Sequence, residues 1–556
     1  MMFRISPSPP LTFANEFTAD LHSAAVKRID DVAMLRNTQF REDAGPTAHP
    51  VKPSEYQAID NFYTTTIYEK GAELIRMLHT LLGAKRFMQG MATYVSRFDG
   101  TAATTEDFVQ AIADGACADG EPLGFDLEQF KTWYHQAGTP QLTVERTWDA
   151  TRGLLTLHFR QQTPPTPEQP IKNPLVLPIA MALIGASGRQ GEERLVVLDQ
   201  EEQVIEIATV PGPQPPALSI LRRFSAPVNL QMEMPLDETL QLLAADDDPF
   251  SRWEAGQRLF RQVLLARAAA EPEPTVEAAL IQALRQRLAE IDLKQGSELA
   301  VLLSLPGMAE LESCQDPVDP LALFNAMQRW RAVLGNELKS ALHDLLEQCR
   351  KDWSQRWPDG QGARSLTGVA WSWLIAAGDA DAPAEALEAV SGPSMTLARA
   401  ALRALQRYEG SEREQALSAF YDRWKDKPVI LDAWFAMEAS APFGDGIARA
   451  DALLEDPAFD PNAPNSLRAV LGGFGRCAEH FHRSDGRGYQ WMAEQLVAVD
   501  QRNPIAASRM LKLFMGWRRY SHERQQLMRS SLEWLAENLT SPNSKEVVML
   551  CLGSAD

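Results

Sequence analysis

The sequence predicts a multidomain fold in which a helical region precedes a small β-sandwich and a long helical solenoid. Three observations predict it. The chain has 556 residues, more than one hydrophobic core usually organises. Apolar residues change from helical spacing to alternation near residue 140, and they return to helical spacing near residue 234. We therefore expect three domains, over residues 1–138, 139–233 and 234–556.

The first region carries apolar residues at helical spacing. Leucine and isoleucine side chains in residues 68–82 fall on one face of a helix. A second helix is expected over residues 107–113, because Thr104 or Thr105 can accept a hydrogen bond from a free amide of its first turn. A third helix is expected over residues 127–137, before a glycine and a proline.

The second region has the period of half-buried strands. Leu142 and Val144 alternate with polar residues, and Leu155, Leu157 and Phe159 do the same after a turn. Further strands are expected over residues 175–184, 194–198, 204–208 and 229–233. Short strands at close spacing without intervening helices predict a small β-sandwich.

The third region reads as helical throughout. Its segments are amphipathic, and each is followed within a few residues by Pro, Gly or Asp. More than three hundred residues of short paired helices exceed one compact bundle, so stacked pairs forming a solenoid are predicted. The glycine-rich run over residues 472–475 lies between predicted helices and is interpreted as a helix-ending turn.

Composition and charge narrow the function classes. Hydrophobic residues make up 45% and charged residues 23% of the chain, as in a folded globular protein. The net charge of -20 argues against a nucleic-acid partner, which needs a basic surface. No apolar run reaches the roughly 20 residues of a membrane span, and the N-terminus lacks the apolar core of a signal peptide. We expect a cytoplasmic protein without membrane contact.

Cysteine and histidine patterns give no metal site. The five cysteines are scattered and odd in number, which favours reduced thiols over a disulfide framework. His480 and His482 are two residues apart, so on a helix they point to nearly opposite faces, and we expect no metal there. His79 is expected to be a hydrogen-bonded histidine of the core. The sequence also lacks a Walker loop, a dinucleotide fingerprint, a Gly-x-Ser-x-Gly elbow and a His-Glu-x-x-His motif.

Five segments resemble bacterial aminopeptidase N, a zinc metallopeptidase family of the gluzincin type with a thermolysin-like catalytic domain. They are residues 22–28 (HSAAVKR), 43–50 (DAGPTAHP), 61–76 (NFYTTTIYEKGAELIR), 130–140 (FKTWYHQAGTP) and 248–255 (DPFSRWEA). The string IYEKGA is a specific marker, and the other segments follow in the family's order. The resemblance runs from about Glu16 to the C-terminus. It implies the helical part of a catalytic domain, an immunoglobulin-like β-domain and a C-terminal helical solenoid.

The resemblance also implies roles for two tyrosines. Tyr68 matches the tyrosine that donates a hydrogen bond to the oxyanion of the tetrahedral intermediate, and Tyr63 matches a second tyrosine of the same pocket. A neutral phenol can stabilise charge that develops mainly in the transition state. The structural alternative is that both tyrosines are half-buried on a helix. For Glu69 and Lys70 a local ion pair or a helix-start charge is the plainer interpretation.

Two arginines of the third region match family residues that face the active-site cavity. By the resemblance, Arg468 and Arg509 can meet the far carboxylate of a bound peptide, so peptides are the expected partners. The alternative is an ordinary solvated arginine on a helix surface.

The zinc ligands that the resemblance implies are absent from this sequence. In the family they are two histidines of His-Glu-x-x-His and a later glutamate, and all should precede Glu16. We therefore expect a fragment of a zinc aminopeptidase, truncated or frameshifted before the zinc-binding motif. We expect it to bind no zinc and to be inactive without the missing N-terminal half. The alternative is a non-catalytic scaffold whose solenoid binds peptides or proteins.

Overall fold

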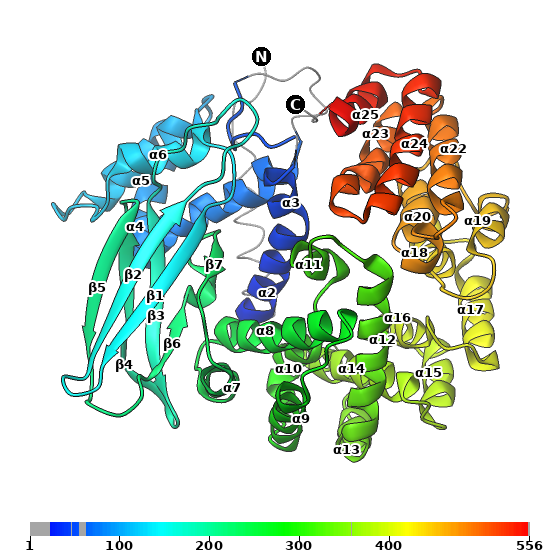
Figure 1. Ribbon diagram of the computed structural model, residues 1–556, viewed down its shortest axis with the longest axis horizontal. Helices are drawn as coiled ribbons and strands as arrows, with labels where there is room; N and C mark the ends of the chain where they lie inside the picture. Colours follow the sequence, from blue (N-terminus) through cyan, green and yellow to red (C-terminus); the bar gives the residue numbers. More distant parts are fainter. Residues whose placement is uncertain (1–22, 46, 55–62, 357, 554–556) are drawn as a thin grey trace. The chain divides into compact units, whose positions relative to one another are not determined.

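A computed structural model of the protein describes residues 23–45, 47–54, 63–356 and 358–553, and it divides into two units, residues 1–258 and 259–556 (Figure 1). Along the chain, helices are followed by two sheets and then by a long succession of helices. The predicted order of helical region, β-sandwich and helical solenoid is therefore confirmed. The expected domain boundaries at residues 138 and 233 remain predictions.

The helices of the first region extend the predicted segments. Thr104 caps α5 as expected, since its hydroxyl accepts from the Asp107 amide (3.1 Å) while the Asp107 carboxylate accepts from the Thr104 amide (2.8 Å). The helix predicted over residues 68–82 continues to Phe98, because Gly83 adopts φ 73° and bends the chain without ending it. The helical elements are α2 (Ala24–Met34), η1 (Leu35–Gln39), α3 (Phe40–Asp43), η3 (Thr66–Lys70), α4 (Gly71–Phe98), α5 (Thr105–Ala116) and α6 (Leu127–His135).

Two sheets form the sandwich. The strands are β1 (Gln141–Asp149), β2 (Leu154–Gln162), β3 (Leu177–Gly185), β4 (Gly188–Leu198), β5 (Glu202–Ala208), β6 (Ala217–Ile220) and β7 (Asn229–Gln231). One sheet has the order β5-β2-β1-β7 and the other the order β4-β3-β6, with β1 and β7 parallel and the other pairs antiparallel. Strand β6 was not predicted, because its four residues are too short to display alternation.

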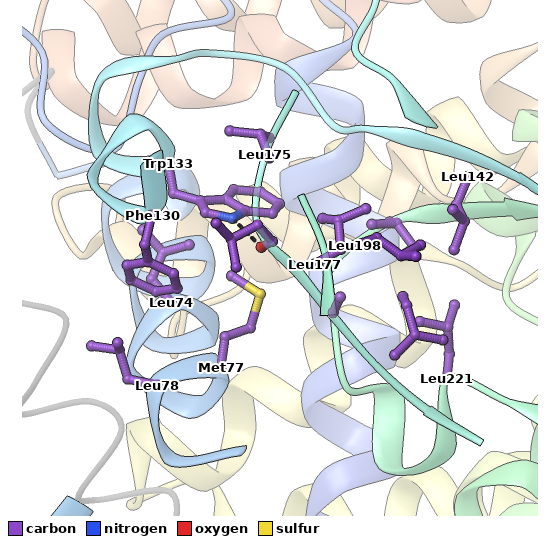
Figure 2. Close-up of a cluster of buried hydrophobic side chains, with 14 of the residues drawn as sticks. Leu74, Met77, Leu78, Phe130, Trp133, Leu142, Leu175, Leu177, Leu198 and Leu221 are labelled. Carbon is purple, nitrogen blue, oxygen red and sulfur yellow. Dashed lines mark hydrogen bonds between the residues drawn. The ribbon is translucent and has the colours of Figure 1, made fainter. Parts of the chain in front are cut away.

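Strand β3 is buried along its whole length. One hydrophobic core joins the sandwich to the helices α4, α5 and α6. Figure 2 shows Leu74 and Leu78 of α4 beside Trp133 of α6 and Leu177 of β3. The Trp133 indole N–H donates to the Val176 carbonyl (2.9 Å), so this buried donor is satisfied. A strand covered on both faces reads as a continuous apolar run rather than an alternating one.

The C-terminal unit is built of short helices joined by tight turns (Figure 1). The run over residues 472–475 forms the last turn of α20, so its expected helix-ending role is confirmed, although it lies inside the helix rather than after it. Gly473 allows the close approach of α18, because a Cβ there would lie 2.9 Å from the Ala439 side chain. Helix α7 (Leu236–Ala245) precedes the boundary of the two units, and α8 (Pro249–Ala268) crosses it. The helical elements that follow are α9 (Pro274–Ala289), η5 (Leu293–Gln295), α10 (Gly296–Leu303), α11 (Met308–Ser313), α12 (Pro320–Glu337), α13 (Lys339–Arg350), α14 (Gln361–Ala376), α15 (Ala382–Val390), α16 (Met395–Leu405), α17 (Ser411–Trp424), α18 (Pro428–Ala439), α19 (Gly446–Leu454), α20 (Pro464–Gly475), α21 (Ala478–Phe481), α22 (Arg487–Asp500), α23 (Pro504–Leu511), η6 (Lys512–Phe514), η7 (Trp517–Arg519), α24 (His522–Asn538) and α25 (Pro542–Gly553).

Asp500 links the end of α22 to the start of α25 through hydrogen bonds. Its carboxylate lies at the end of α22 and accepts hydrogen bonds from the amides of Thr540 (2.9 Å) and Ser541 (2.9 Å), just before α25. These bonds satisfy amide groups near the start of a helix. None of the helices in the described residues is long and apolar enough to cross a bilayer.

Candidate functional site

The two candidate tyrosines lie next to each other where α4 begins. Tyr68 is half-buried in η3, a π-helical turn that leads directly into α4, and Tyr63 lies before this turn with 54% of its surface exposed. Their ring centroids are 6.3 Å apart with 28° between the planes. The alternative that both tyrosines are half-buried on a helix is therefore wrong for Tyr63. Single π-helical turns occur frequently at functional sites.

The hydroxyl of Tyr68 forms no hydrogen bond with any other described residue. The Tyr68 ring stacks on Tyr63, and its neighbours Thr66, Ile67 and Lys70 in η3 are buried. A phenol in this state can donate its proton to a ligand at no cost in broken internal bonds.

Helix α3 clamps the turn that carries Tyr68 from one side. A single oxygen of the Glu42 carboxylate accepts from the Thr66 amide (2.9 Å) and from the hydroxyls of Thr65 (2.8 Å) and Thr66 (2.8 Å). A carboxylate placed at free amides in this way both caps a helix and favours its dipole. The start of η3 is thus fixed two residues before Tyr68.

The next residue of α3 fixes the other end of the same turn. Lys70 is only 1% exposed, and its ammonium donates to Asp43 Oδ2 (3.0 Å) and to the Gly138 carbonyl (2.9 Å). Asp43 also accepts from the Thr139 hydroxyl (2.9 Å). The plain interpretation of Lys70 as a local or helix-start charge is therefore wrong, because its partner lies 27 residues away and both charges are buried. Thr66 and Lys70 together bracket Tyr68.

A second buried ion pair holds α4 one turn later. Both guanidinium nitrogens of Arg28 donate to the Glu73 carboxylate at 2.6 Å, and Arg28 also donates to the Phe224 carbonyl (2.9 Å). A bidentate pair of this kind fixes orientation as well as distance. Sequence reasoning did not assign Arg28, Glu42, Asp43 or Glu73 a role, although the segments quoted for the resemblance contain three of them.

Charges around Glu69 affect its protonation. Burial raises the pKa of the Glu69 carboxyl, and the nearby Asp31 carboxylate raises it further. On the other side of the turn, burial and then the charge of Lys70 lower the pKa of Lys172 to about 8. The Lys172 ammonium donates to the Ala137 carbonyl (2.9 Å), so this second lysine also holds the chain near the clamp.

Arg468 and Arg509 lie in the C-terminal unit. Arg468 is exposed on α20 and Arg509 is exposed on α23, two helices that pack against each other. Within the described residues, neither guanidinium forms an ion pair or a hydrogen bond. Their roles in binding a peptide carboxylate stay predictions.

The histidines behave differently from one another. His79 is exposed on α4 and meets Phe87 edge-on at 5.3 Å, so the expectation of a core histidine is wrong. Its neighbours Met77 and Leu78 are buried, so His79 lies just outside the buried face of α4. His482 is buried and shares a hydrogen bond with the Tyr489 hydroxyl (2.8 Å), and burial lowers the pKa of His482 to about 3.

Three family models match successive parts of the chain. Residues 12–133 match the peptidase family M1 domain, residues 138–233 match a domain of unknown function with an immunoglobulin-like fold, and residues 236–553 match a domain of unknown function made of armadillo-type (ARM) repeats. The chain is 40% identical over 547 residues to aminopeptidase N of Caulobacter vibrioides, an alignment that covers 96% of this chain and 62% of that protein. The chain belongs to the aminopeptidase N family.

Two further relatives extend the match. Aminopeptidase N of Escherichia coli is 33% identical over 543 residues, covering 94% of this chain and 61% of that protein. A crystal structure of Legionella pneumophila aminopeptidase A in complex with aspartic acid superposes with a TM-score of 0.84 at 26% identity, covering 99% of this chain and 62% of that one. The chain thus spans about three-fifths of the length of the aminopeptidases it matches.

The zinc that the aminopeptidase N family implies can be tested against the side chains present. A zinc site needs three or four histidine, cysteine or carboxylate ligands at one point. In the part of the chain that the structure describes, no group of three or more such side chains could hold a metal ion. The five cysteines are free, and the buried ones are Cys349, Cys477 and Cys551. The described residues therefore do not fit a zinc ion.

Proposed function

We propose that this chain supplies the oxyanion-stabilising part of an aminopeptidase that removes N-terminal residues from peptides. The observation that carries the proposal is Tyr68, whose hydroxyl has no partner among the described residues while Glu42 and Asp43 fix the backbone on both sides of it. The family membership of the chain supports the same reaction class.

Tyr68 would act as a hydrogen-bond donor. When a peptide carbonyl becomes tetrahedral, its oxygen gains negative charge, and a donor that is already in place stabilises this charge without reorganising. The clamp by α3 supplies that preorganisation, because a shift of either end of η3 would break a partly buried or a buried hydrogen bond. Tyr63 would pack against the Tyr68 ring and orient it.

We propose further that the chain is inactive alone and acts with a segment that supplies the zinc ligands. The printed sequence has no His-Glu-x-x-His motif, and a hydrogen bond from Tyr68 does not replace a Lewis acid that contributes several kcal/mol. The partners are peptides and this segment, and zinc belongs to the assembled enzyme.

Metal analysis and a complementation assay test this proposal. The purified chain should hold no stoichiometric zinc and should not cleave an alanyl anilide. Adding a zinc-binding N-terminal segment from an aminopeptidase N relative should restore cleavage. One tightly held zinc per purified chain, together with turnover, would contradict the proposal.

The alternative is a non-catalytic scaffold that binds peptides through the C-terminal helices. The exposed Arg468 and Arg509, which have no partner among the described residues, favour it. Complementation that never restores turnover, combined with peptide binding that is lost on Arg468→Gln, would favour the scaffold over the enzyme.

A further inference from the structure

The link between strands β6 and β7 has a strained backbone. Among the described residues, five other than glycine have a positive φ, and three of them lie together here: Leu221 (φ 55°), Arg223 (φ 54°) and Phe224 (φ 51°). This left-handed conformation costs free energy for any residue with a side chain, because the Cβ atom comes too close to the backbone. Residues 221–224 are called the left-handed turn below.

Hydrogen bonds to acidic side chains hold the left-handed turn in place. The Arg222 side chain is buried and donates to the carboxylates of Glu193 (2.7 Å) and Asp246 (2.7 Å). The Arg223 amide donates to the Asp248 carboxylate (2.9 Å). A strained backbone persists only where the surrounding contacts over-determine it, and such segments are concentrated at functional sites. The left-handed turn is therefore maintained against the preference of its own backbone.

The left-handed turn presents two carbonyl groups to one guanidinium. Arg28 of α2 donates from Nε to the Arg223 carbonyl (2.8 Å) and from Nη2 to the Phe224 carbonyl (2.9 Å). Its Nη1 and Nη2 atoms also donate to the two oxygens of the Glu73 carboxylate, both at 2.6 Å. The φ and ψ angles of the turn determine where its carbonyls point, so a right-handed conformation would remove these two acceptors from Arg28.

Glu73 connects this arrangement to Tyr68. It is the third residue of α4, five residues after Tyr68, and η3 leads into α4 without a break. The left-handed turn also contacts α3, because the centroids of the Phe224 ring and of the Phe40 ring at the start of that helix lie 6.5 Å apart. The turn thus meets α3 directly and α4 through Arg28, and η3 is hydrogen-bonded to the first helix and continuous with the second.

We propose that Arg28 is a positioning residue for Tyr68, and that the left-handed turn holds Arg28 in the orientation that this role requires. The link between β6 and β7 thereby determines where the Tyr68 hydroxyl lies. The proposal rests on the oxyanion role proposed above for Tyr68, which needs the donor in place before the charge develops. A displacement of about 1 Å in a catalytic group can lower the rate by about 100-fold.

Kinetics of the complemented enzyme test the positioning role. Arg28→Lys keeps the charge but not the planar fork, so it should lower kcat by about 10- to 100-fold and leave KM within about twofold. In a Tyr68→Phe enzyme the same change should lower kcat by less than about twofold, because Arg28 acts through the Tyr68 hydroxyl. An arginine with a merely structural role would lower kcat equally in both backgrounds, and that result would overturn the proposal.

Arg36→Lys is the matched control. The guanidinium carbon of Arg36 lies 5.2 Å from the centroid of the Phe224 ring, against 5.5 Å for Arg28. Its ion pair, however, joins it to Glu254 of α8 (2.6 Å) rather than to α4. Arg36→Lys should therefore leave kcat and KM within about twofold. A loss of kcat as large as that of Arg28→Lys would overturn the proposal.

Hydrogen exchange on the purified chain tests the link without turnover. Arg28→Lys should speed the exchange of the amides in residues 67–73 by about 10-fold or more, and Arg36→Lys should not. Unchanged exchange in Arg28→Lys, or equal changes in the two variants, would overturn the proposal. Failure of every complemented enzyme to turn over would instead contradict the proposed function, and the exchange result would still decide whether Arg28 holds the backbone that carries Tyr68.

Thermal melting of two further variants tests the left-handed turn itself. Arg223→Gly and Arg223→Ala lack the same exposed side chain, but only glycine adopts a positive φ without strain. Arg223→Gly should therefore melt at the higher temperature. Equal melting temperatures would show that the turn is not held in the left-handed conformation, and this would overturn its part in the proposal.

Discussion

Two places in the molecule, one in each unit, treat basic side chains in opposite ways. In the N-terminal unit, Lys70 donates to Asp43 at 3.0 Å and Arg28 donates to Glu73 at 2.6 Å, with all four side chains buried. In the C-terminal unit, Arg331 has no acid at bonding distance among the described residues. A basic side chain that is paired with an acid fixes the backbone around it, whereas one without an acidic partner remains available to a ligand.

Breaking a paired base should have the largest effect. Asp43→Ala leaves the Lys70 ammonium buried and unpaired, so the free energy of opening α4 should fall by about 3–5 kcal/mol. Hydrogen exchange of the α4 amides measures this quantity. Adding Lys70→Met should recover part of the loss, because the uncompensated charge is then gone.

A surface pair of the same unit is the control for that experiment. Glu128 accepts from Lys131 at 2.6 Å, but the Glu128 side chain is largely exposed. Glu128→Ala should cost only about 0–1 kcal/mol. Equal effects of Asp43→Ala and Glu128→Ala would mean that burial does not distinguish these pairs.

The next largest effect concerns the Tyr68 hydroxyl, which has no hydrogen-bond partner among the described residues of the N-terminal unit. In the complemented enzyme, Tyr68→Phe should lower kcat by about 100- to 1000-fold with little change in KM, because the lost bond belongs to the transition state. Tyr63→Phe should do less, since its ring mainly packs against Tyr68. Steady-state kinetics with an alanyl anilide measures both values. A Tyr68→Phe enzyme with near-normal kcat would remove the oxyanion role from this residue.

A paired acid of the C-terminal unit should give a smaller, pH-dependent effect. Burial opposes the charged form of Asp500, but hydrogen bonds from Ser541, Ser544 and backbone amides outweigh it and lower its pKa from 3.8 to about 2. A lowered folded-state pKa stabilises the protein above the ordinary value, and this stabilisation is lost as the pH falls from about 4 through 2. Asp500→Asn should therefore cost about 2 kcal/mol at pH 5 and progressively less towards pH 2.

Chemical denaturation at several pH values checks the Asp500 prediction. Asp422→Asn provides a control, because Asp422 is an exposed carboxylate whose nearest base, Lys425, lies 3.7 Å away. The Asp422→Asn difference from wild type should stay within about 0.5 kcal/mol throughout. A cost of Asp500→Asn that stays constant from pH 5 to pH 2 would show that the protonation of Asp500 is not responsible.

The smallest effect should come from an unpaired arginine. Arg468 is exposed and has no partner among the described residues, so Arg468→Gln should change the free energy of unfolding by less than about 0.5 kcal/mol. The matched variant is Arg413→Gln, which removes a hydrogen bond to Glu438 at 2.6 Å and should cost roughly 1.5–3 kcal/mol. If Arg468→Gln is as costly as Arg413→Gln, the arginine has a structural role that its exposure does not reveal.

The order of the three regions was predictable because local spacing alone determines it. The alternation that includes Leu142 and Leu155 appears in the structure as the buried face of β1 and β2, and Thr104 caps α5 as its side chain requires. The likeness of residues 61–76 to one family also identified the tyrosines that the structure brings together.

Other features depend on contacts between distant residues. The burial of Lys70 requires Asp43, Gly138 and Thr139 to meet, and no local pattern in the sequence reports this. The π-helical form of η3 likewise cannot be predicted from apolar spacing, because that spacing assumes the 3.6 residues per turn of an α-helix. His79 was assigned to the core because it lies among apolar residues in the sequence, but local spacing does not report which side of α4 the rest of the fold covers.

The burial of β3 on both faces has a consequence for synthesis of the chain. The apolar face of α4, which includes Leu74 and Leu78, is completed by β3 residues such as Leu177. That strand leaves the ribosome roughly 100 residues after the helix, or about 5–20 s later at typical elongation rates. During this interval the face of α4 has no native partner from β3, and the contacts that close it join residues far apart in sequence, which fold slowly. Until β3 has been synthesised, this part of the apolar face of α4 is therefore open to non-native apolar contacts.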